Sequence, residues 1–100
     1  MRITVRKFGD VLTSRSAGRE AHLAMQAYLL KSIGKGETIE VDFSGVRVLT
    51  PAWADEFLSP LFDEYKGGVA LLYTKENPSV QLTLEFLEGI KKMKFPRGEK

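Results

Sequence analysis

Alternating polar and apolar residues open the chain, and this pattern is typical of a half-buried strand. Ile3 and Val5 are separated by polar residues over positions 2–7. Because successive side chains of a strand point to opposite faces, the pattern predicts a strand with one buried face. The Gly9-Asp10 pair predicts a turn, and Val11-Leu12 is expected to add a short second strand as a hairpin.

The first helix is predicted to follow the run Thr13-Ser14-Arg15-Ser16, whose short hydroxyl side chains can accept hydrogen bonds from the free amides of a first turn. It is expected to continue to about Ser32. The glycines of Gly34-Lys35-Gly36 tolerate the left-handed conformation that ends helices. The apolar stripe expected to face the core consists of Leu23, Ala24, Ala27, Tyr28 and Leu30.

Two further strand–helix pairs follow in the sequence. Residues 38–43 alternate and residues 69–74 are almost wholly apolar, so both predict strands. The segment Val46-Arg47-Val48-Leu49 leads into Thr50-Pro51, and Asn77-Pro78 follows the later strand. A capping side chain followed by proline predicts a helix start in each case. The last helix is expected to run to about residue 93.

Proline inside the helix that follows Thr50 predicts an irregularity. Pro60 lacks the N–H group that an interior helical residue donates. We therefore expect either a kink there or a break, with Ser59 capping a second short helix.

The order of elements is β(β)αβαβα, which predicts an α/β fold with right-handed crossovers between parallel strands. Polar residues on the two alternating strands indicate that one face of the sheet is open; these are Arg2, Thr4, Arg6, Glu40 and Asp42. We expect a single small domain with a mixed four- to five-stranded sheet and helices packed on one face. Its core is expected to include Ile39, Val41, Phe57, Leu61, Leu71 and Leu84.

Composition and charge narrow the prediction to one soluble domain. The 100 residues are 43% hydrophobic and 28% charged, which suits a single globular core. Residues 1–93 are expected to form the domain and residues 94–100 a frayed basic tail, because cations cluster near the end of the chain. The apolar stretch 21–30 is too short to span a membrane, and the chain start lacks the apolar run of a signal peptide. We expect a cytoplasmic protein.

Few side chains are suited to catalysis or metal binding. The sequence has no cysteine and one histidine, His22, which is expected to lie at the flank of the first helix rather than to act as a base. Asp55-Glu56 and Asp63-Glu64 are neighbours on a helix and point about 100° apart, so neither pair is expected to grip a metal. They are interpreted as solvated helix faces. We expect no enzyme activity, no metal and no cofactor.

The strongest candidate for a functional surface lies between residues 42 and 57. Ser44 falls in a predicted turn and Thr50 at a predicted helix start, where hydroxyl groups are expected for local hydrogen bonding alone. The functional alternative is that the exposed helix N-terminus, with its partial positive charge, forms a docking or phosphate-sensitive surface.

At these residues the chain resembles STAS domains, the fold of the anti-sigma-factor antagonists. More closely, it resembles the bacterial STAS-like family of unknown function DUF4325. The resemblance implies a small mixed sheet with helices on one side and a non-enzymatic regulatory module that binds protein. It rests on four stretches spread over about residues 3–90: Thr13-Ser14-Arg15-Ser16-Ala17-Gly18-Arg19, Val41-Asp42-Phe43-Ser44-Gly45-Val46, Ala54-Asp55-Glu56-Phe57 and Asn77-Pro78-Ser79-Val80.

The resemblance also implies a site and a departure from the family pattern. STAS antagonists dock a kinase-type anti-sigma partner on the loop after the central strand and on the following helix. Their switch is a phosphorylatable serine in an Asp-Ser/Thr-Ser/Thr-Gly motif at that helix start. By alignment Thr50 falls on the aspartate, Pro51 and Ala52 on the two hydroxyl positions, and Trp53 on the glycine. Ala52 has no hydroxyl, so docking is implied without the usual phosphoserine switch.

The partner-binding residues predicted in this way are Ser44, Thr50, Pro51, Ala52 and Trp53, with Ser14, Arg15 and Arg19 nearby. Trp53 also belongs to the apolar stripe of its helix, so it is expected to support the surface from below. Ser44 and Thr50 are the hydroxyl groups left in this segment for modification.

The resulting hypothesis is a protein-binding module in bacterial signalling or transcriptional control. Its partner would be a protein such as a histidine-kinase-like ATPase or an anti-sigma-type regulator. Two alternatives stay open. One is a sensor of a small anion or nucleotide at the helix starts near Ser14 and Thr50. The other is an accessory protein that binds nucleic acid through its basic tail, although a solubilising tail explains the same charges and nucleic acid is not the expected partner.

Overall fold

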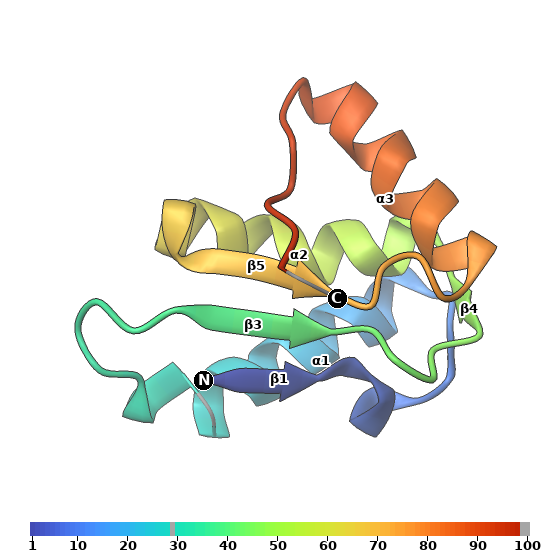
Figure 1. The fold of residues 1–100 in the computed structure, drawn as a ribbon. Coiled ribbons are helices and arrows are strands. Elements are labelled where there is room, and N and C mark those ends of the chain that lie inside the picture. Colours follow the sequence, from blue (N-terminus) through green and yellow to red (C-terminus); the bar gives the residue numbers. More distant parts are fainter. Residues whose placement is uncertain (29, 99–100) are drawn as a thin grey trace.

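The computed structural model describes residues 1–28 and 30–98, and in them three α-helices pack with two small parallel sheets (Figure 1). Strands β1 (Arg2–Thr4), β3 (Ile39–Asp42) and β5 (Val69–Leu72) form one sheet in the order β1-β3-β5, and β2 (Val11–Leu12) pairs with β4 (Val48–Leu49). The helices are α1 (Arg15–Tyr28), α2 (Pro51–Tyr65) and α3 (Pro78–Lys91), with short 3-10 helices at Val5–Phe8, Leu30–Ser32 and Lys66–Gly68.

Helices α1 and α2 cover one face of the three-stranded sheet, and α3 packs against α2 and β4 (Figure 1). All six predicted core residues are fully buried between these layers. The opposite face of the sheet is polar. There the Arg2 guanidinium lies 3.6 Å from the Glu40 carboxylate and 3.7 Å from that of Asp42. The prediction of an α/β domain with one polar sheet face is therefore confirmed.

The strands do not form one mixed sheet, and this part of the prediction is wrong. Every strand pair is parallel, and the strands divide between two sheets. β1 ends at Thr4, opposite Asp42, where β3 also ends. The chain then coils into a 3-10 helix instead of continuing as a strand to residue 7, and this helix ends at Gly9 with φ 132°. The turn directs β2 away from β1, so β2 pairs in parallel with β4 in place of the expected hairpin.

Helix α1 is rotated relative to the predicted apolar stripe. Ala21, His22 and Met25 are buried, whereas Leu23 is 53% exposed. Ala24 and Ala27 are also exposed, and the side chains of Tyr28 and Leu30 lie outside the described residues. The rotation is set where α1 crosses α2. A Cβ atom on Gly18 would lie 2.5 Å from the Trp53 carbonyl oxygen, so the glycine must face α2 at this crossing.

Three predicted helix starts are confirmed by their capping hydrogen bonds. Ser14 Oγ accepts from the Ala17 N–H at 3.1 Å, Thr50 Oγ1 from the Trp53 N–H at 3.4 Å and Asn77 Oδ1 from the Ser79 N–H at 2.8 Å. Helix α2 continues through Pro60 to Tyr65, so the break expected at Ser59 does not occur. The Ser59 hydroxyl instead donates to the Asp55 carboxylate at 2.6 Å.

Residues 94–98 pack onto the domain, contrary to the expectation of a frayed tail. Phe95 is 2% exposed, and its ring stacks on that of Phe62 with 4.8 Å between centroids. The Leu71 N–H donates to the Pro96 carbonyl and the Gly98 N–H donates to the Leu71 carbonyl, each at 2.8 Å. This segment therefore adds a parallel bridge beside β5. Residues 99–100 of the predicted tail lie outside the described residues.

Candidate functional site

The N-termini of α1 and α2 lie next to each other at the ends of β2 and β4, and most of the predicted site residues lie there. The Thr50 N–H donates to the Leu12 carbonyl at 3.0 Å, and the Thr50 hydroxyl donates to the Thr13 carbonyl at 2.7 Å. The same hydroxyl caps α2 by accepting from the Trp53 N–H. Thr50 therefore connects the end of β2 to the start of α2, and both its donor and its acceptor capacity are in use.

Trp53 does not belong to the exposed part of this site. Its side chain is 1% exposed and stacks on the Phe57 ring, with 4.8 Å between centroids. As expected, it supports the helix start from below. Pro51 and Ala52, in the same first turn of α2, are partly exposed and form the accessible side of that turn.

Ser44 lies in the loop that follows β3. Its N–H donates to Asp42 Oδ1 at 2.8 Å, and the next residue, Gly45, has φ 79°. This geometry is that of an Asx turn, in which an aspartate side chain stabilises a local reversal. Within the described residues no hydrogen bond or ion pair joins Ser44 to Ser14, Thr50 or Arg15. The structure thus gives Ser44 a role in a turn and does not join it to the helix starts.

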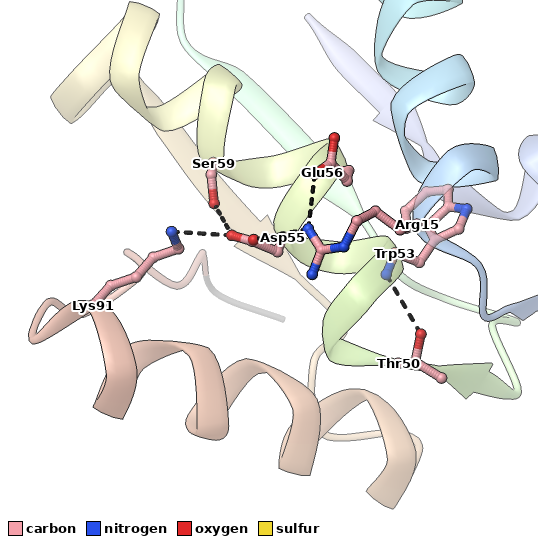
Figure 2. A network of polar contacts seen from close by, with 7 residues as sticks. All are labelled: Arg15, Thr50, Trp53, Asp55, Glu56, Ser59 and Lys91. Atoms are coloured by element: carbon pink, nitrogen blue, oxygen red, sulfur yellow. Dashed lines mark hydrogen bonds and ion pairs between the residues drawn. The ribbon is translucent and has the colours of Figure 1, made fainter.

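Asp55 is the centre of a charged network that links the three helices, and Arg15 contributes to it from α1 (Figure 2). The Arg15 Nη1 atom lies 2.7 Å from Glu56 Oε2 and 3.3 Å from Asp55 Oδ2. Asp55 Oδ1 lies 3.0 Å from the Lys91 ammonium on α3 and also accepts from Ser59. The interpretation of Asp55-Glu56 as a solvated helix face is therefore wrong. The side chain of Asp55 is 30% exposed and that of Glu56 is 29% exposed, and both carboxylates form ion pairs. Arg19, one turn beyond Arg15, is exposed.

The network changes the acidity of Asp55. The hydrogen bond from Ser59, followed by contributions from Lys91 and Arg15, lowers the pKa of the Asp55 carboxyl below its ordinary value of 3.8. A depressed pKa in the folded state means that the ionised carboxylate contributes stability above its unfolded pKa. That contribution is lost as the pH falls through the folded pKa.

We expect Asp55→Asn to lower the free energy of unfolding at pH 7 by about 1 kcal/mol, the size typical of partly exposed charged contacts. The difference between the variant and the unmodified protein should shrink as the pH falls below about 4, where the carboxyl becomes protonated. Urea unfolding at several pH values measures this. The exposed Asp63 lies on the same helix, and Asp63→Asn serves as the control. A difference for Asp55→Asn that persists undiminished at the lowest pH would contradict the assignment.

A shallow apolar hollow of about 350 Å³ opens beside the start of α1. Val11 at its margin is 48% exposed, and Val48, its partner in the parallel register of β2 and β4, is 37% exposed. Neighbouring side chains across a strand pair point to the same face, so the two valines form a small apolar patch. We call Val11, Ser14, Val48, Thr50, Pro51 and Ala52 the helix-start surface. The hollow is lined by Phe8, Val11, Leu12, Thr13, Ser14, Ala17, Glu20, Ala21, Ala24 and Trp53.

The single histidine of the chain makes a structural contact. His22 is 7% exposed, and its Nδ1 atom lies 3.2 Å from the Phe57 carbonyl oxygen, so it is buried rather than at the helix flank. In residues 1–28 and 30–98 no three His, Asp or Glu side chains are grouped to hold a metal ion. No helix in the same residues is long and apolar enough to cross a membrane.

Comparison with known protein families shows to which family the chain belongs. The family model of the STAS-like domain of unknown function, DUF4325, matches residues 27–81. The chain belongs to this family. The matched residues run from the end of α1 to the start of α3 and include β3, β4, α2 and β5. No curated protein and no solved structure matches the chain.

Three features of this STAS-like domain were not predicted from the sequence. The isolated Gly18 inside a helical pattern was a signal for close backbone approach. The Asp55 network joins residues up to 41 positions apart, and the sequence carries no local signal for it. The Val11–Val48 patch depends on a pairing between two-residue strands, which are too short to show a periodic pattern.

Proposed function

We propose that this STAS-like domain is a non-enzymatic interaction module whose helix-start surface binds a regulatory protein. The observation that carries the proposal is the exposed, in-register pair Val11–Val48 beside the accessible first turn of α2. Apolar side chains exposed next to polar groups with fixed positions are suited to binding a protein. The polar groups there form caps and ion pairs, which supports a role in binding over catalysis.

The family resemblance supports the class of partner. STAS antagonists bind a histidine-kinase-like ATPase or another anti-sigma-type regulator, and we propose a regulator of this kind in bacterial signalling or transcriptional control. The domain would bind it without the usual phosphoserine switch. Ala52 stands at the phosphoacceptor position, and the Thr50 hydroxyl is engaged in two hydrogen bonds. Binding is then constitutive and depends on abundance or on the state of the partner.

The two alternative functions have weaker support. A small anion at the helix starts would compete with Ser14 and Thr50, whose oxygens already accept backbone N–H bonds. A basic tail that binds nucleic acid would need free cations. Two of the cations are engaged within the domain, because Lys91 pairs with Asp55 and Arg97 pairs with Glu88, and residues 94–98 are packed on the domain. The exposed Lys92 and Lys94 are then the candidates for such binding.

The test introduces a charge into the first turn of α2. We expect Ala52→Glu to weaken binding of the partner at least about tenfold, because a buried interface charge without a partner costs several kcal/mol. Proteins captured from the native host by the unmodified domain are compared with those captured by Ala52→Glu. Each protein that the unmodified domain captures and Ala52→Glu does not is then purified, and its affinity for both forms of the domain is measured directly. Circular dichroism and thermal unfolding check that the variant is folded.

Ala27→Glu provides the matched control, since Ala27 is exposed near the other end of α1. It should bind as the unmodified domain does. Val48→Asp is a second variant of the helix-start surface and keeps the test decisive if Ala52→Glu fails to fold. Equal affinity of the purified partner for all folded variants would overturn the proposed site.

A further inference from the structure

Helix α3 presents a second apolar surface on the side that faces away from the domain. Its inner side chains Val80, Leu84 and Leu87 are buried in the core. Its outer side chains are unusually apolar, and Figure 1 shows the helix at the margin of the molecule. Leu82 is 66%, Phe86 55% and Ile90 61% exposed, and Met93, just beyond the helix end, is 38% exposed. We call Leu82, Phe86, Ile90 and Met93 the α3 row.

The spacing of the α3 row makes it continuous. Residues four positions apart lie one above the other on a helix, so Leu82, Phe86 and Ile90 form a single ridge. Such i, i+4 ridges pack into the grooves of another helix. A continuous ridge of large apolar side chains differs from the isolated exposed residues that occur on any protein surface.

The charges beside the α3 row are arranged so that two antiparallel copies of α3 would be complementary in charge. The exposed Glu85 lies beside its first half, and the exposed Lys92 lies just after the helix end, beside its second half. The midpoint of the row falls between Phe86 and Gly89. A two-fold axis there would place a second α3 antiparallel to the first. Glu85 of each copy would then lie near Lys92 of the other, which gives two equivalent ion pairs.

The centre of the row also has the space that this arrangement needs. Gly89 is exposed, and apart from its two neighbours and the backbone of its own helix no atom of the described residues lies within 4 Å of the position that a Cβ would occupy. A Phe86 ring from the second copy can therefore lie against the helix backbone at Gly89. Beside the first half of the row, a hollow of about 550 Å³ is lined by Pro51, Leu82, Thr83, Glu85 and Phe86. It offers further room for side chains of the second copy.

We propose that a second copy of this chain packs antiparallel on the α3 row and forms a symmetric dimer. The inference goes beyond the proposed function and concerns a different surface, although Pro51 borders both. Four side chains at these exposures would bury roughly 400–500 Å² per copy, against about 800 Å² per partner in stable complexes. The interface is smaller than that of a stable complex, so we expect a weak dimer with a dissociation constant of about 10–100 μM.

Sedimentation velocity over a protein concentration range from about 10 μM to about 1 mM tests the proposal, because the range spans the expected dissociation constant. We expect the unmodified protein to shift from monomer to dimer across this range. Phe86→Asp should remain monomeric throughout, because its charge would lie at the centre of the contact. Phe86 is more than half exposed, so the variant is expected to fold, and circular dichroism checks this.

Charge reversal identifies the two-fold arrangement. Glu85→Lys and Lys92→Glu should each weaken the dimer at least about threefold, because each places like charges opposite one another. A mixture of these two single variants should associate more strongly than either alone, since lysines of one copy then face glutamates of the other. The exposed Glu64 and Lys35 provide matched reversals, Glu64→Lys and Lys35→Glu, which should not change association.

Two results would overturn the proposal. The first is a monomer at every concentration, which would leave the α3 row to a different protein. The second is a dimer that withstands Phe86→Asp or whose charge-reversed variants show no recovery on mixing. Neither result bears on the helix-start surface, because none of these substitutions lies within it.

Discussion

Replacing Gly18 by alanine is expected to lower the free energy of unfolding by about 1–3 kcal/mol, the usual range for overpacking a tight contact. The added Cβ would lie 2.5 Å from the Trp53 carbonyl oxygen and 2.9 Å from the Trp53 Cα. Both atoms belong to the backbone of α2, so no side-chain rotation can relieve the clash. The helices must separate at the point where α1 and α2 are packed against each other.

The sign of this effect is the informative part. Alanine is a better helix former than glycine by about 1 kcal/mol, so Gly18→Ala would stabilise the protein if helix propensity alone acted. Gly89→Ala is the matched control, because Gly89 lies in α3 with open space around its Cβ position. It should raise the free energy of unfolding by about 0.5–1 kcal/mol.

Urea unfolding at low micromolar concentration, where association through the α3 row is negligible, compares the two variants. Opposite signs at Gly18 and Gly89 are expected. A Gly18→Ala variant as stable as the unmodified protein would show that the helices can separate without loss, and would contradict the role given to this glycine.

The same crossing explains why the sequence predicted the existence of α1 but not its orientation. Capping residues and glycines define the ends of a helix locally. The caps at Thr50 and Asn77 were predicted correctly, and the cap of α1 is Ser14, one of the candidates in the run 13–16. The buried side of α1 is decided by a contact with α2. That contact turns the small residues Gly18 and Ala21 inward and leaves Leu23 exposed, so an estimate based on apolar side chains alone selects the wrong face.

The sheets show a similar division between local and long-range information. Ile39, Val41 and Leu71 could be assigned to the core because their strands have clear apolar patterns. The partner of β2 could not be predicted, because a two-residue strand has too few side chains to specify a register. Its pairing with β4 follows from the 3-10 helix after β1, which turns the chain away from a hairpin.

The helix start at the candidate site was predicted correctly, whereas the contacts around it were predicted only in part. Thr50, Pro51 and Ala52 form an accessible helix start, as expected, and Trp53 lies beneath them. On their own helix the adjacent carboxylates Asp55 and Glu56 point apart, so the sequence predicts a solvated face. Their partner Arg15 lies on a different helix, so the ion pairs exist only after the helices pack.

Replacing Phe95 by alanine is expected to lower the free energy of unfolding by about 3–5 kcal/mol, the range for a buried aromatic side chain. Phe95 is 2% exposed and stacks on Phe62, which itself belongs to the core. The buried Glu88 carboxylate also holds the segment, since it accepts from the Phe95 N–H at 2.7 Å and pairs with Arg97 at 3.2 Å. For a domain of this size the loss is a large share of the total stability.

The exposed neighbour Lys94 gives the control, and Lys94→Ala should change the free energy of unfolding by less than about 0.5 kcal/mol. If residues 94–98 were a frayed tail, the Phe95 and Lys94 variants would be equally stable in urea, and that outcome would contradict the packing described above. The difference also determines how the nucleic-acid hypothesis can be tested. Deleting residues 94–100 would remove Phe95 and the bridge beside β5, and any loss of binding could then reflect unfolding. Neutralising Lys92 and Lys94 with glutamine removes charge while leaving Phe95 and the Glu88–Arg97 pair in place, so a loss of binding by that variant would reflect electrostatics alone.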